Sequence, residues 1–299
     1  MNEGQLSKKE LQEVFSKMGL DLLFVIQEAF LGYKYRKLRG KLYENDTLIP
    51  TSLIRMYYSL NPSDIEFDNM RKTFIRKYVM NESKLEGVHT QDEIAGFIDM
   101  YEYLHSEEFD HYFSIYSLKD LNQKLFSHAT YPEYGGRYRN MDVYLPGSGV
   151  PLTEWCMIPQ EMHQISPQVD YLHELAKLVK DSGDVDELLS FMDQCVELKC
   201  DLIRIHPFID GNGRTVRAFI NKLFEDAGLP AIYVKSGERA EYQKAMNQAL
   251  GDGDTTAIKL FYRYKVCDSI IELDINERMR RQLKEVKEKG YQKRKKGEK

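Results

Sequence analysis

One short stretch of the sequence, IHPFIDGNGRTVR at residues 205–217, carries side chains that together could do chemistry. His206 has an ordinary pKa close to neutrality and can take a proton from a hydroxyl group. Asp210 offers a hard carboxylate oxygen of the kind that Mg²⁺ accepts beside phosphates. Arg214 and Arg217 are three residues apart, so on a helix they share a face and can each fork onto phosphate oxygens. These groups predict transfer from a nucleoside triphosphate to a hydroxyl.

The elements around this stretch must place the base opposite the phosphate site. A long helical pattern ends at His206, because Pro207 disfavours the helical conformation at the residue before it. Phe208 is the apolar residue that is expected to anchor the loop in the core. Gly211 and Gly213 remove side chains at the start of the next helix, where backbone N–H groups and the helix dipole favour an anion.

Helical periodicity dominates the rest of the chain and predicts an all-α protein. Capping signals at Thr90 and Asp184 predict where two of the helices begin. One segment, GGRYRNMDVYLPGSG, does not follow the helical pattern. In it, every second residue from 139 to 145 belongs to one set, Arg139, Met141, Val143 and Leu145, and the residues between them are Asn140, Asp142 and Tyr144. A Pro-Gly-Ser-Gly turn follows. This pattern predicts a strand in a small β-hairpin, which has too few strands to form a sheet core. The hairpin is either a surface flap whose edge pairs with an extended peptide, or a structural element packed on the helices.

Composition and patterning narrow the class of protein. The chain has 299 residues, a formal net charge of −5 and 42% hydrophobic residues, which is ordinary for a globular protein. The tail RMRRQLKEVKEKGYQKRKKGEK is strongly basic and is interpreted as a solvated helix end, with attraction to nucleic acid or an anionic surface as the alternative. The chain as a whole is not basic, so nucleic acid is not an expected partner. The start of the chain has no apolar signal region, and no apolar run is long enough to span a membrane. With four cysteines that lack C-x-x-C spacing, these features predict a cytoplasmic protein with reduced thiols.

The stretch 205–217 resembles the signature of the Fic family, H-P-F-x-[DE]-G-N-G-R-x-x-R, with every specified position present. The resemblance implies a Fic-type helical bundle core with a small β-hairpin flap and an N-terminal helical region. It also implies adenylylation, the transfer of AMP from ATP to a Ser, Thr or Tyr hydroxyl of a target protein. His206 would be the general base, and Asp210 would hold Mg²⁺ between the α- and β-phosphates.

The resemblance also assigns the nucleotide contacts. The backbone of residues 211–213 and Asn212 would cradle the α- and β-phosphates, Arg214 would bind the β-phosphate and Arg217 the γ-phosphate. The full nucleotide-binding set is Phe208, Gly211, Asn212, Gly213, Arg214, Arg217 and Tyr242. The intact Gly-Asn-Gly-Arg run argues against the Doc-type relatives, which act as kinases and depart from it.

Two further stretches resemble other parts of the family. The segment GGRYR and the residues after it, 135–150, resemble the flap that clamps the backbone of the target beside the active site. The target-docking residues would be Arg139, Asn140, Met141, Asp142, Val143 and Tyr144. The stretch ERAEYQKAMNQAL resembles a helix that helps to form the nucleobase pocket, with Tyr242 stacking on the base. Packing of Tyr242 into the core is the alternative, and both interpretations stay open.

The stretch NESKLEGVHT resembles an inhibitory helix of many Fic proteins, in which Ser or Thr is followed four residues later by Glu and then by Gly or Asn. Glu86 and Gly87 match the end of that motif. Glu82 stands where the hydroxyl residue is expected, and Ser83 follows one residue later. The resemblance implies that Glu86 pairs with Arg217 in place of the γ-phosphate, which would leave ATP misaligned for attack. A surface glutamate ahead of a helix-ending glycine is the alternative.

The chain is expected to comprise three regions. Residues 1–120 form an N-terminal helical region with the inhibitory motif at 82–87, and residues 121–265 form the Fic core with its flap at 135–150. Residues 266–299 form a C-terminal helix and the basic tail.

The expected function is therefore protein adenylylation with ATP as substrate and Mg²⁺ as the metal ion. The sequence does not name the target protein, and it leaves self-modification and homo-oligomer formation open. One alternative is the transfer of UMP or phosphate, or mainly the removal of AMP from modified targets. A second alternative, from another class, is a non-catalytic regulatory module that binds a nucleotide.

Overall fold

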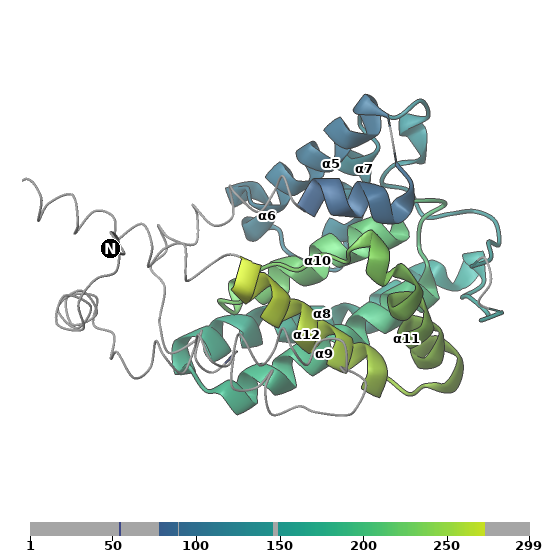
Figure 1. Ribbon diagram of the computed structural model, residues 1–299. Helices are drawn as coiled ribbons and strands as arrows, with labels where there is room; N and C mark the ends of the chain where they lie inside the picture. Colours follow the sequence, from purple (N-terminus) through teal and green to yellow (C-terminus); the bar gives the residue numbers. More distant parts are fainter. Residues whose placement is uncertain (1–53, 55–77, 89, 146–148, 273–299) are drawn as a thin grey trace, which may run out of the picture. The chain divides into compact units, whose positions relative to one another are not determined.

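Figure 1 shows the computed structural model of the chain, which describes residues 54, 78–88, 90–145 and 149–272. The chain divides into two compact units, one made of Met1–Tyr57 and Ile270–Lys299 and the other of Tyr58–Ser269. The sites discussed below all belong to the second unit. Apart from Ile54, the N-terminal helical region expected before residue 78 lies outside the described residues, as does the basic tail.

Helices make up the regular structure of the described residues. The α-helices are α5 (Gln91–Leu104), α6 (Glu107–His111), α7 (Ser117–Leu125), α8 (Ile158–Ser182), α9 (Val185–Ile205), α10 (Asn212–Asp226), α11 (Arg239–Asp252) and α12 (Thr256–Glu272). Short 3-10 helices are η2 (Pro132–Tyr134), η3 (Trp155–Met157) and η4 (Ser236–Glu238), and residues 78–86 are also helical. The predicted all-α fold is confirmed. Among these described helices, none has the length and apolar character needed to cross a membrane.

Helix α10 lies at the centre of the unit, with α5 and α7 on one side and α8 and α9 on the other (Figure 1). Its apolar stripe is fully buried and consists of Val216, Phe219, Ile220, Leu223 and Phe224. Its first turns also bury two cations, because Arg214 and Arg217 are only 7% and 6% exposed. Buried charge is costly without partners, so the elements packed around α10 must supply them.

The loop between α9 and α10 reverses the chain through two left-handed residues. Helix α9 begins at Asp184, whose carboxylate accepts hydrogen bonds from the N–H groups of Asp186 and Glu187 at 2.8 and 3.1 Å. It ends at His206, which has φ 49° and ψ 61°. Gly211, with φ 78°, precedes the first residue of α10. The loop thus places the carboxyl end of α9 beside the amino end of α10, and the two helices pack together.

The β-hairpin expected over residues 139–145 is not formed, and that prediction is wrong for the described residues. The described part of the segment contains only an isolated antiparallel bridge between Tyr138 and Phe208. Arg139 donates its backbone N–H to Pro207 O at 2.9 Å, so the segment pairs with the loop after α9 instead of with itself. The turn residues 146–148 lie outside the described residues.

Candidate active site

The loop that carries the sequence motif is held by a reciprocal pair of hydrogen bonds. Asn212 accepts a hydrogen bond from the backbone N–H of Phe208 and donates one to its carbonyl oxygen, both at 2.8 Å. The Phe208 side chain is fully buried, as the sequence predicts for an anchor. Both hydrogen bonds use the side-chain amide of Asn212. The backbone N–H of Asn212 is therefore the group that would contact a nucleotide.

Gly211 is required by its surroundings as well as by its left-handed φ. A Cβ atom there would lie 2.8 Å from Cε2 of Phe126 and 2.9 Å from both Nδ2 of Asn122 and Cδ2 of Leu125. These are shorter than any normal contact with a Cβ atom, so the end of α7 fits against the loop only because the glycine has no side chain.

His206 is placed as a neutral base. Its ring Nδ1 lies 3.3 Å from the carbonyl oxygen of Ile203. A carbonyl can only accept, so Nδ1 carries the proton and the neutral ring presents an unprotonated Nε2. Burial above all, together with the charge of Arg139, lowers the pKa of His206 to about 4, although the Ile203 carbonyl and Asp210 oppose this. At neutral pH the imidazole can therefore accept a proton.

The amino end of α10 is built to accept an anion. Gly211 caps it without a side chain, so no side-chain oxygen occupies the free N–H groups of the first turn. The first turn also carries no acidic residue. Free N–H groups and the helix dipole both favour a phosphate at this end, as the sequence predicts.

Asp210 and Arg214 lie together beside this helix end. Oδ1 of Asp210 accepts hydrogen bonds from the N–H of Gly211 at 2.6 Å and from the Arg214 guanidinium at 3.2 Å. The guanidinium of Arg214 also lies 5.8 and 5.6 Å from the ring centres of Phe97 and Phe126, which suits a planar cation. Arg214 is therefore a buried cation that faces the loop from between two aromatic rings.

The surroundings of Asp210 fit a Mg²⁺ ion that arrives with phosphates. The described residues contain no cluster of three or more His, Cys, Asp or Glu side chains that could hold a metal by themselves. Asp210 is 65% exposed next to the anion site, so its carboxylate is open to solvent. Mg²⁺ commonly binds through one or two carboxylates, with phosphate oxygens and water as its other ligands. Asp210 would supply one such carboxylate.

Arg217 binds two glutamates from the helical residues 78–86. Its Nε donates to Oε2 of Glu82 at 2.6 Å, and one of its terminal nitrogens donates to Oε1 of Glu86. The expected pairing of Glu86 with Arg217 is therefore present, with Glu82 as an additional partner. Although burial raises the pKa of Glu86, the charge and hydrogen bond of Arg217 outweigh it and leave that pKa lowered. Burial raises the pKa of Glu82 despite the opposing charge of Arg217.

The other two residues of the expected inhibitory motif have different positions. Gly87 ends the helical segment with φ 72°, and the N–H of Val88 donates to Ser83 O at 2.8 Å. The Ser83 hydroxyl is buried and has no hydrogen-bond partner among the described residues. Ser83 lies one residue after Glu82, so it points about 100° away around the helix. Its hydroxyl does not brace Glu86.

The segment expected to dock a target has one residue turned inward and five turned outward. Arg139 is buried, and its guanidinium donates to the carbonyls of His206 and Met141 at 2.8 Å each and to that of Thr153. The side chains that follow it, Asn140, Met141, Asp142, Val143 and Tyr144, are exposed or half-buried. Arg139 thus supports the end of α9, while the residues after it are open to a partner.

Tyr242 on α11 packs into the core. It is 8% exposed, and its ring centre lies 5.6 Å from that of Phe261. The ammonium group of Lys199, itself fully buried, lies 4.8 Å from the same ring centre. Of the two interpretations left open, the structure has the core-packing one, and this ring offers no free face for a nucleobase.

The structure adds supporting residues that the sequence pattern does not single out. Asn122 on α7 is fully buried and donates to Asp210 O and Thr215 Oγ1, both at 3.2 Å. It also accepts a hydrogen bond from the N–H of Gly136 at 3.0 Å. A polar residue inside the apolar stripe of α7 is the only sequence signal for this role.

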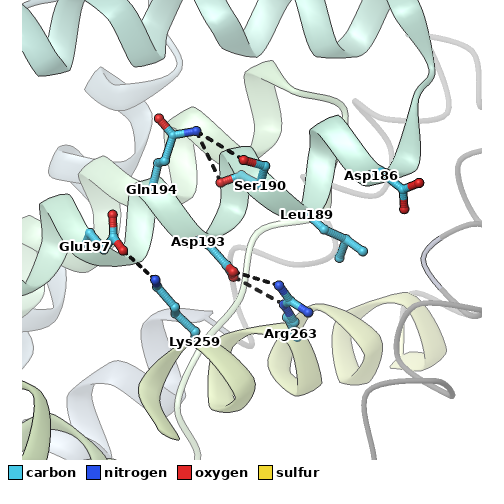
Figure 2. Close-up of a pocket in the computed structure, with 8 residues that line it drawn as sticks. All are labelled: Asp186, Leu189, Ser190, Asp193, Gln194, Glu197, Lys259 and Arg263. Atoms are coloured by element: carbon cyan, nitrogen blue, oxygen red, sulfur yellow. Dashed lines mark hydrogen bonds and ion pairs between the residues drawn. The ribbon is translucent and has the colours of Figure 1, made fainter. Parts of the chain in front are cut away.

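A surface groove of about 430 Å³ lies away from the motif, between α9 and α12 (Figure 2). Its lining residues are Asp186, Leu189, Ser190, Asp193, Gln194, Glu197, Lys259 and Arg263. Its cations are paired across the groove, Arg263 with Asp193 at 2.7 Å and Lys259 with Glu197. None of the motif residues lines this groove, so it is not part of the candidate active site.

A family model and several known proteins are similar to this chain. Residues 112–224 match the model of the Fic/DOC family. The chain is 27% identical over 204 residues to Protein adenylyltransferase Fic of Nematostella vectensis, an alignment that covers 67% of this chain and 43% of the relative. It is 28% identical over 152 residues to Protein adenylyltransferase fic-1 of Caenorhabditis elegans, covering 50% of this chain and 26% of the relative. The chain therefore spans less than half the length of these relatives.

Solved structures share the fold. A fragment of Fic-1 from C. elegans superposes with a TM-score of 0.52 at 20% identity, covering 89% of this chain and 75% of that chain. A Fic domain containing signaling protein from Bacteroides thetaiotaomicron superposes with a TM-score of 0.57 at 16% identity, covering 75% of this chain and 96% of that chain. The family match over residues 112–224, the helical fold and the complete motif between α9 and α10 agree, and this part of the chain is similar to the Fic/DOC family.

Proposed function

We propose that the protein is an adenylyltransferase, which moves AMP from ATP to a Ser, Thr or Tyr hydroxyl of a target protein. The observation that carries this proposal is a neutral His206 at the end of α9, beside the uncapped amino end of α10. A base next to a phosphate site is what transfer to a hydroxyl requires. The names of the relatives, protein adenylyltransferases, support AMP as the transferred group.

The triphosphate would bind along the first turns of α10. The backbone N–H groups of residues 211–213 would hold the α- and β-phosphates, with Arg214 at the β-phosphate and Arg217 at the γ-phosphate. Gly213 supports this arrangement, because a Cβ atom there would lie only 2.9 Å from a terminal nitrogen of Arg217. Arg217 thus reaches back over the first turn of α10, where the phosphates would lie.

In the transfer step, Nε2 of His206 takes the proton of the target hydroxyl. The hydroxyl oxygen then forms a bond to the α-phosphorus, and the bond from that phosphorus to the oxygen bridging the α- and β-phosphates breaks. Pyrophosphate leaves with the bond electrons, and AMP remains on the target. The low pKa of His206 keeps the base unprotonated before the hydroxyl arrives.

Mg²⁺ would be held by Asp210, and when bound it neutralises charge that develops on the phosphates. Because Asp210 also pairs with Arg214 at 3.2 Å, this carboxylate would be shared between the metal and the cation. Arg214 is braced by two aromatic rings as well, so it keeps its position if Asp210 turns toward the metal.

The target would dock on the exposed residues Asn140, Met141, Asp142 and Tyr144 and on the half-buried Val143. They follow directly after Arg139, whose side chain binds the carbonyl of His206 at 2.8 Å. A backbone held against this segment would therefore lie close to the catalytic base. Met141 and Tyr144 are 55% and 87% exposed, so an apolar side chain of the target could cover them.

With Glu86 bound to Arg217, the protein would be inhibited. Oε1 of Glu86 lies close to Gly213 in the first turn of α10: a Cβ atom added to Gly213 would be only 3.2 Å from it. A carboxylate in this place would compete with the γ-phosphate for the same guanidinium. Removal of Glu86 should therefore activate the protein toward ATP.

Intact-mass measurement of the Glu86→Gly protein, incubated with Mg²⁺ and each nucleoside triphosphate in turn, tests the proposed reaction. We expect self-labelling or target labelling by one AMP with ATP, and much less in the protein with Glu86. His206→Ala in the Glu86→Gly background should abolish labelling while ATP binding persists. This double variant is the matched control for non-enzymatic labelling.

Other results would redirect the assignment. A mass gain of UMP or of phosphate alone would identify a different transferred group. ATP binding with no labelling by any nucleotide, with or without added cell extract, would favour a regulatory module that only binds nucleotide. Labelling retained in the His206→Ala variant would remove this residue as the base.

A further inference from the structure

Arg217 is held by two carboxylates that lie one helical turn apart. Glu82 binds Nε at 2.6 Å, and Glu86 binds a terminal nitrogen of the same guanidinium. One cation therefore faces two anions. If both glutamates are ionised, the cluster carries one negative charge in excess, so one of the two can leave without stranding the cation.

The two glutamates differ in burial. The side chain of Glu82 is 0% exposed, whereas that of Glu86 is 33% exposed. Burial, and after it the charge of Glu82, raise the pKa of Tyr78, which is itself fully buried. The Glu82 carboxylate is therefore enclosed in the core, whereas that of Glu86 is partly open to solvent.

Glu86 lies toward the amino end of α10. A Cβ atom on Gly213 would lie 2.9 Å from terminal nitrogen Nη1 of Arg217 and 3.2 Å from Oε1 of Glu86. Only Glu86 thus occupies the space that a phosphate at this helix end would need. A phosphate could replace Glu86 and leave the contact between Glu82 and Arg217 intact.

We propose that Glu82 is a positioning residue for Arg217: it keeps the terminal nitrogens of the guanidinium directed at the phosphate site, whether Glu86 or a phosphate binds them. Glu86 is the exchangeable partner and Glu82 the permanent one. This inference rests on the proposed function, in which Arg217 binds the γ-phosphate of ATP. It predicts that the two glutamates act in opposite directions, since loss of Glu86 activates and loss of Glu82 impairs.

The physical reason lies in what each removal leaves behind. Without Glu86, Arg217 keeps a buried ion pair with Glu82 and gains a free terminal nitrogen. Without Glu82, the Nε edge of a guanidinium that is 6% exposed loses its acceptor in the core. The guanidinium would then turn to find another acceptor, and its terminal nitrogens would no longer point to the phosphate site.

Nucleotide binding separates these roles. We would measure the Kd values for ATP and ADP with Mg²⁺ in Glu86→Gly, Glu82→Ala/Glu86→Gly and Glu82→Gln/Glu86→Gly proteins. Relative to Glu86→Gly, the Glu82→Ala/Glu86→Gly protein should bind ATP more weakly, on the order of tenfold, as expected for a lost hydrogen bond to a charged group. Its Kd for ADP should be nearly unchanged. Gln keeps an oxygen that accepts from Nε, so it should retain the preference for ATP. Lys84→Ala, an exposed change on the same helical segment, is the control for helix stability.

The opposite sign would overturn the inference. If Glu82→Ala raises ATP affinity relative to ADP, Glu82 is a second inhibitory carboxylate. Glu82 would also be inhibitory if Glu82→Gln alone, with Glu86 present, activates labelling as Glu86→Gly does. This second comparison decides the matter even if the Ala variant fails to fold.

A direct readout of the ion pair distinguishes failure of this inference from failure of the proposed function. In ¹⁵N-labelled Glu86→Gly protein without nucleotide, the Nε–H of Arg217, assigned by its loss in Arg217→Lys, should exchange slowly with solvent. Fast exchange there would overturn the permanent pairing. If exchange is slow but Glu86→Gly binds ATP no more tightly than ADP, the γ-phosphate assignment fails instead, while the pairing stands.

Discussion

At the scale of the residue, His206 has an unusual backbone conformation. It is the one non-glycine residue with positive φ in the described part of the chain, and such backbone strain persists only where neighbours enforce it. Arg139 enforces it here, because the guanidinium binds the His206 carbonyl and the adjacent backbone N–H binds that of Pro207. The same geometry buries the imidazole and lowers its pKa to about 4.

This low pKa predicts the pH dependence of the proposed transfer. A histidine whose folded pKa lies below the ordinary value keeps its neutral form down to that lower pH, so the base stays competent well below pH 6.5. For the Glu86→Gly protein, kcat/KM should stay level as the pH falls from 8 to about 5.5, a range taken from the ordinary titration of histidine. A fall in rate centred near pH 6.5, with the protein still folded, would contradict the lowered pKa.

Arg139 gives a second prediction at this scale. Arg139→Gln removes the charge and most of the contacts that fix the end of α9. In the Glu86→Gly background kcat should fall on the order of a hundredfold, the usual effect of misplacing a catalytic group by about 1 Å. The acid limb of the pH profile should also move to higher pH, because the charge of Arg139 lowers the pKa of His206. Arg204→Gln removes a partly exposed charge from the last turn of α9 and is the control; equal losses in both variants would argue against a positioning role for Arg139.

At the scale of the element, α9, its loop and α10 form one unit that close contacts hold to α7. Gly211→Ala should therefore be strongly destabilising. It adds the cost of a left-handed alanine, about 1–2 kcal/mol, to overlap with Phe126 and Asn122, which typically costs about 1–3 kcal/mol more. Gly183→Ala is the matched control, since Gly183 has φ 65° but nothing within 4 Å of its added Cβ atom. Chemical denaturation should show a clearly larger loss for Gly211→Ala; equal losses would mean that the packing against α7 does not matter.

Local rules predict part of these elements from the sequence. Capping at Thr90 and Asp184 is confirmed, because both side chains accept hydrogen bonds from the first turns of α5 and α9. Helix α8 was not predicted, since Pro167 lies within it and proline normally ends a helix. The strand over 139–145 was predicted wrongly, since alternation cannot reveal that Arg139 would turn inward and bind carbonyls of the neighbouring loop.

The site itself was predictable where residue type alone fixes the chemistry. His206, Asp210 and the two arginines lie around one helix start, as their spacing suggests. The pairing of Glu82 with Arg217 could not be predicted, because it depends on how residues 78–86 pack against α10. A glutamate in place of a hydroxyl residue is only a departure from a pattern until the structure shows its partner.

At the scale of the whole molecule, the pair of Glu86 and Arg217 would, on the proposed function, link folding to nucleotide binding. The pair joins residues 78–86 to the buried α10, which lies at the centre of the unit (Figure 1). The folded pKa of Glu86 is lowered, so its contribution to stability is present above the ordinary pKa of 4.5 and is lost as the pH falls through the lowered value. Near neutral pH Glu86 is therefore ionised, and a triphosphate that binds Arg217 as proposed would have to compete with it.

This competition predicts how the whole protein responds to ATP. Without nucleotide, Glu86→Gly should melt at a lower temperature than the parent, because an ion pair is lost. With Mg²⁺ and ATP, the Tm of Glu86→Gly should rise more than the Tm of the parent. A ligand at 100 times its Kd stabilises a folded protein by about 2.7 kcal/mol, whereas the parent, with Arg217 occupied by Glu86, should gain much less. Glu86→Gly with His206→Ala should gain as much as Glu86→Gly alone, which shows that the shift reports binding and not labelling. If ATP raises the Tm of the parent and of Glu86→Gly equally, Glu86 does not compete with the nucleotide, and the pair with Arg217 is structural.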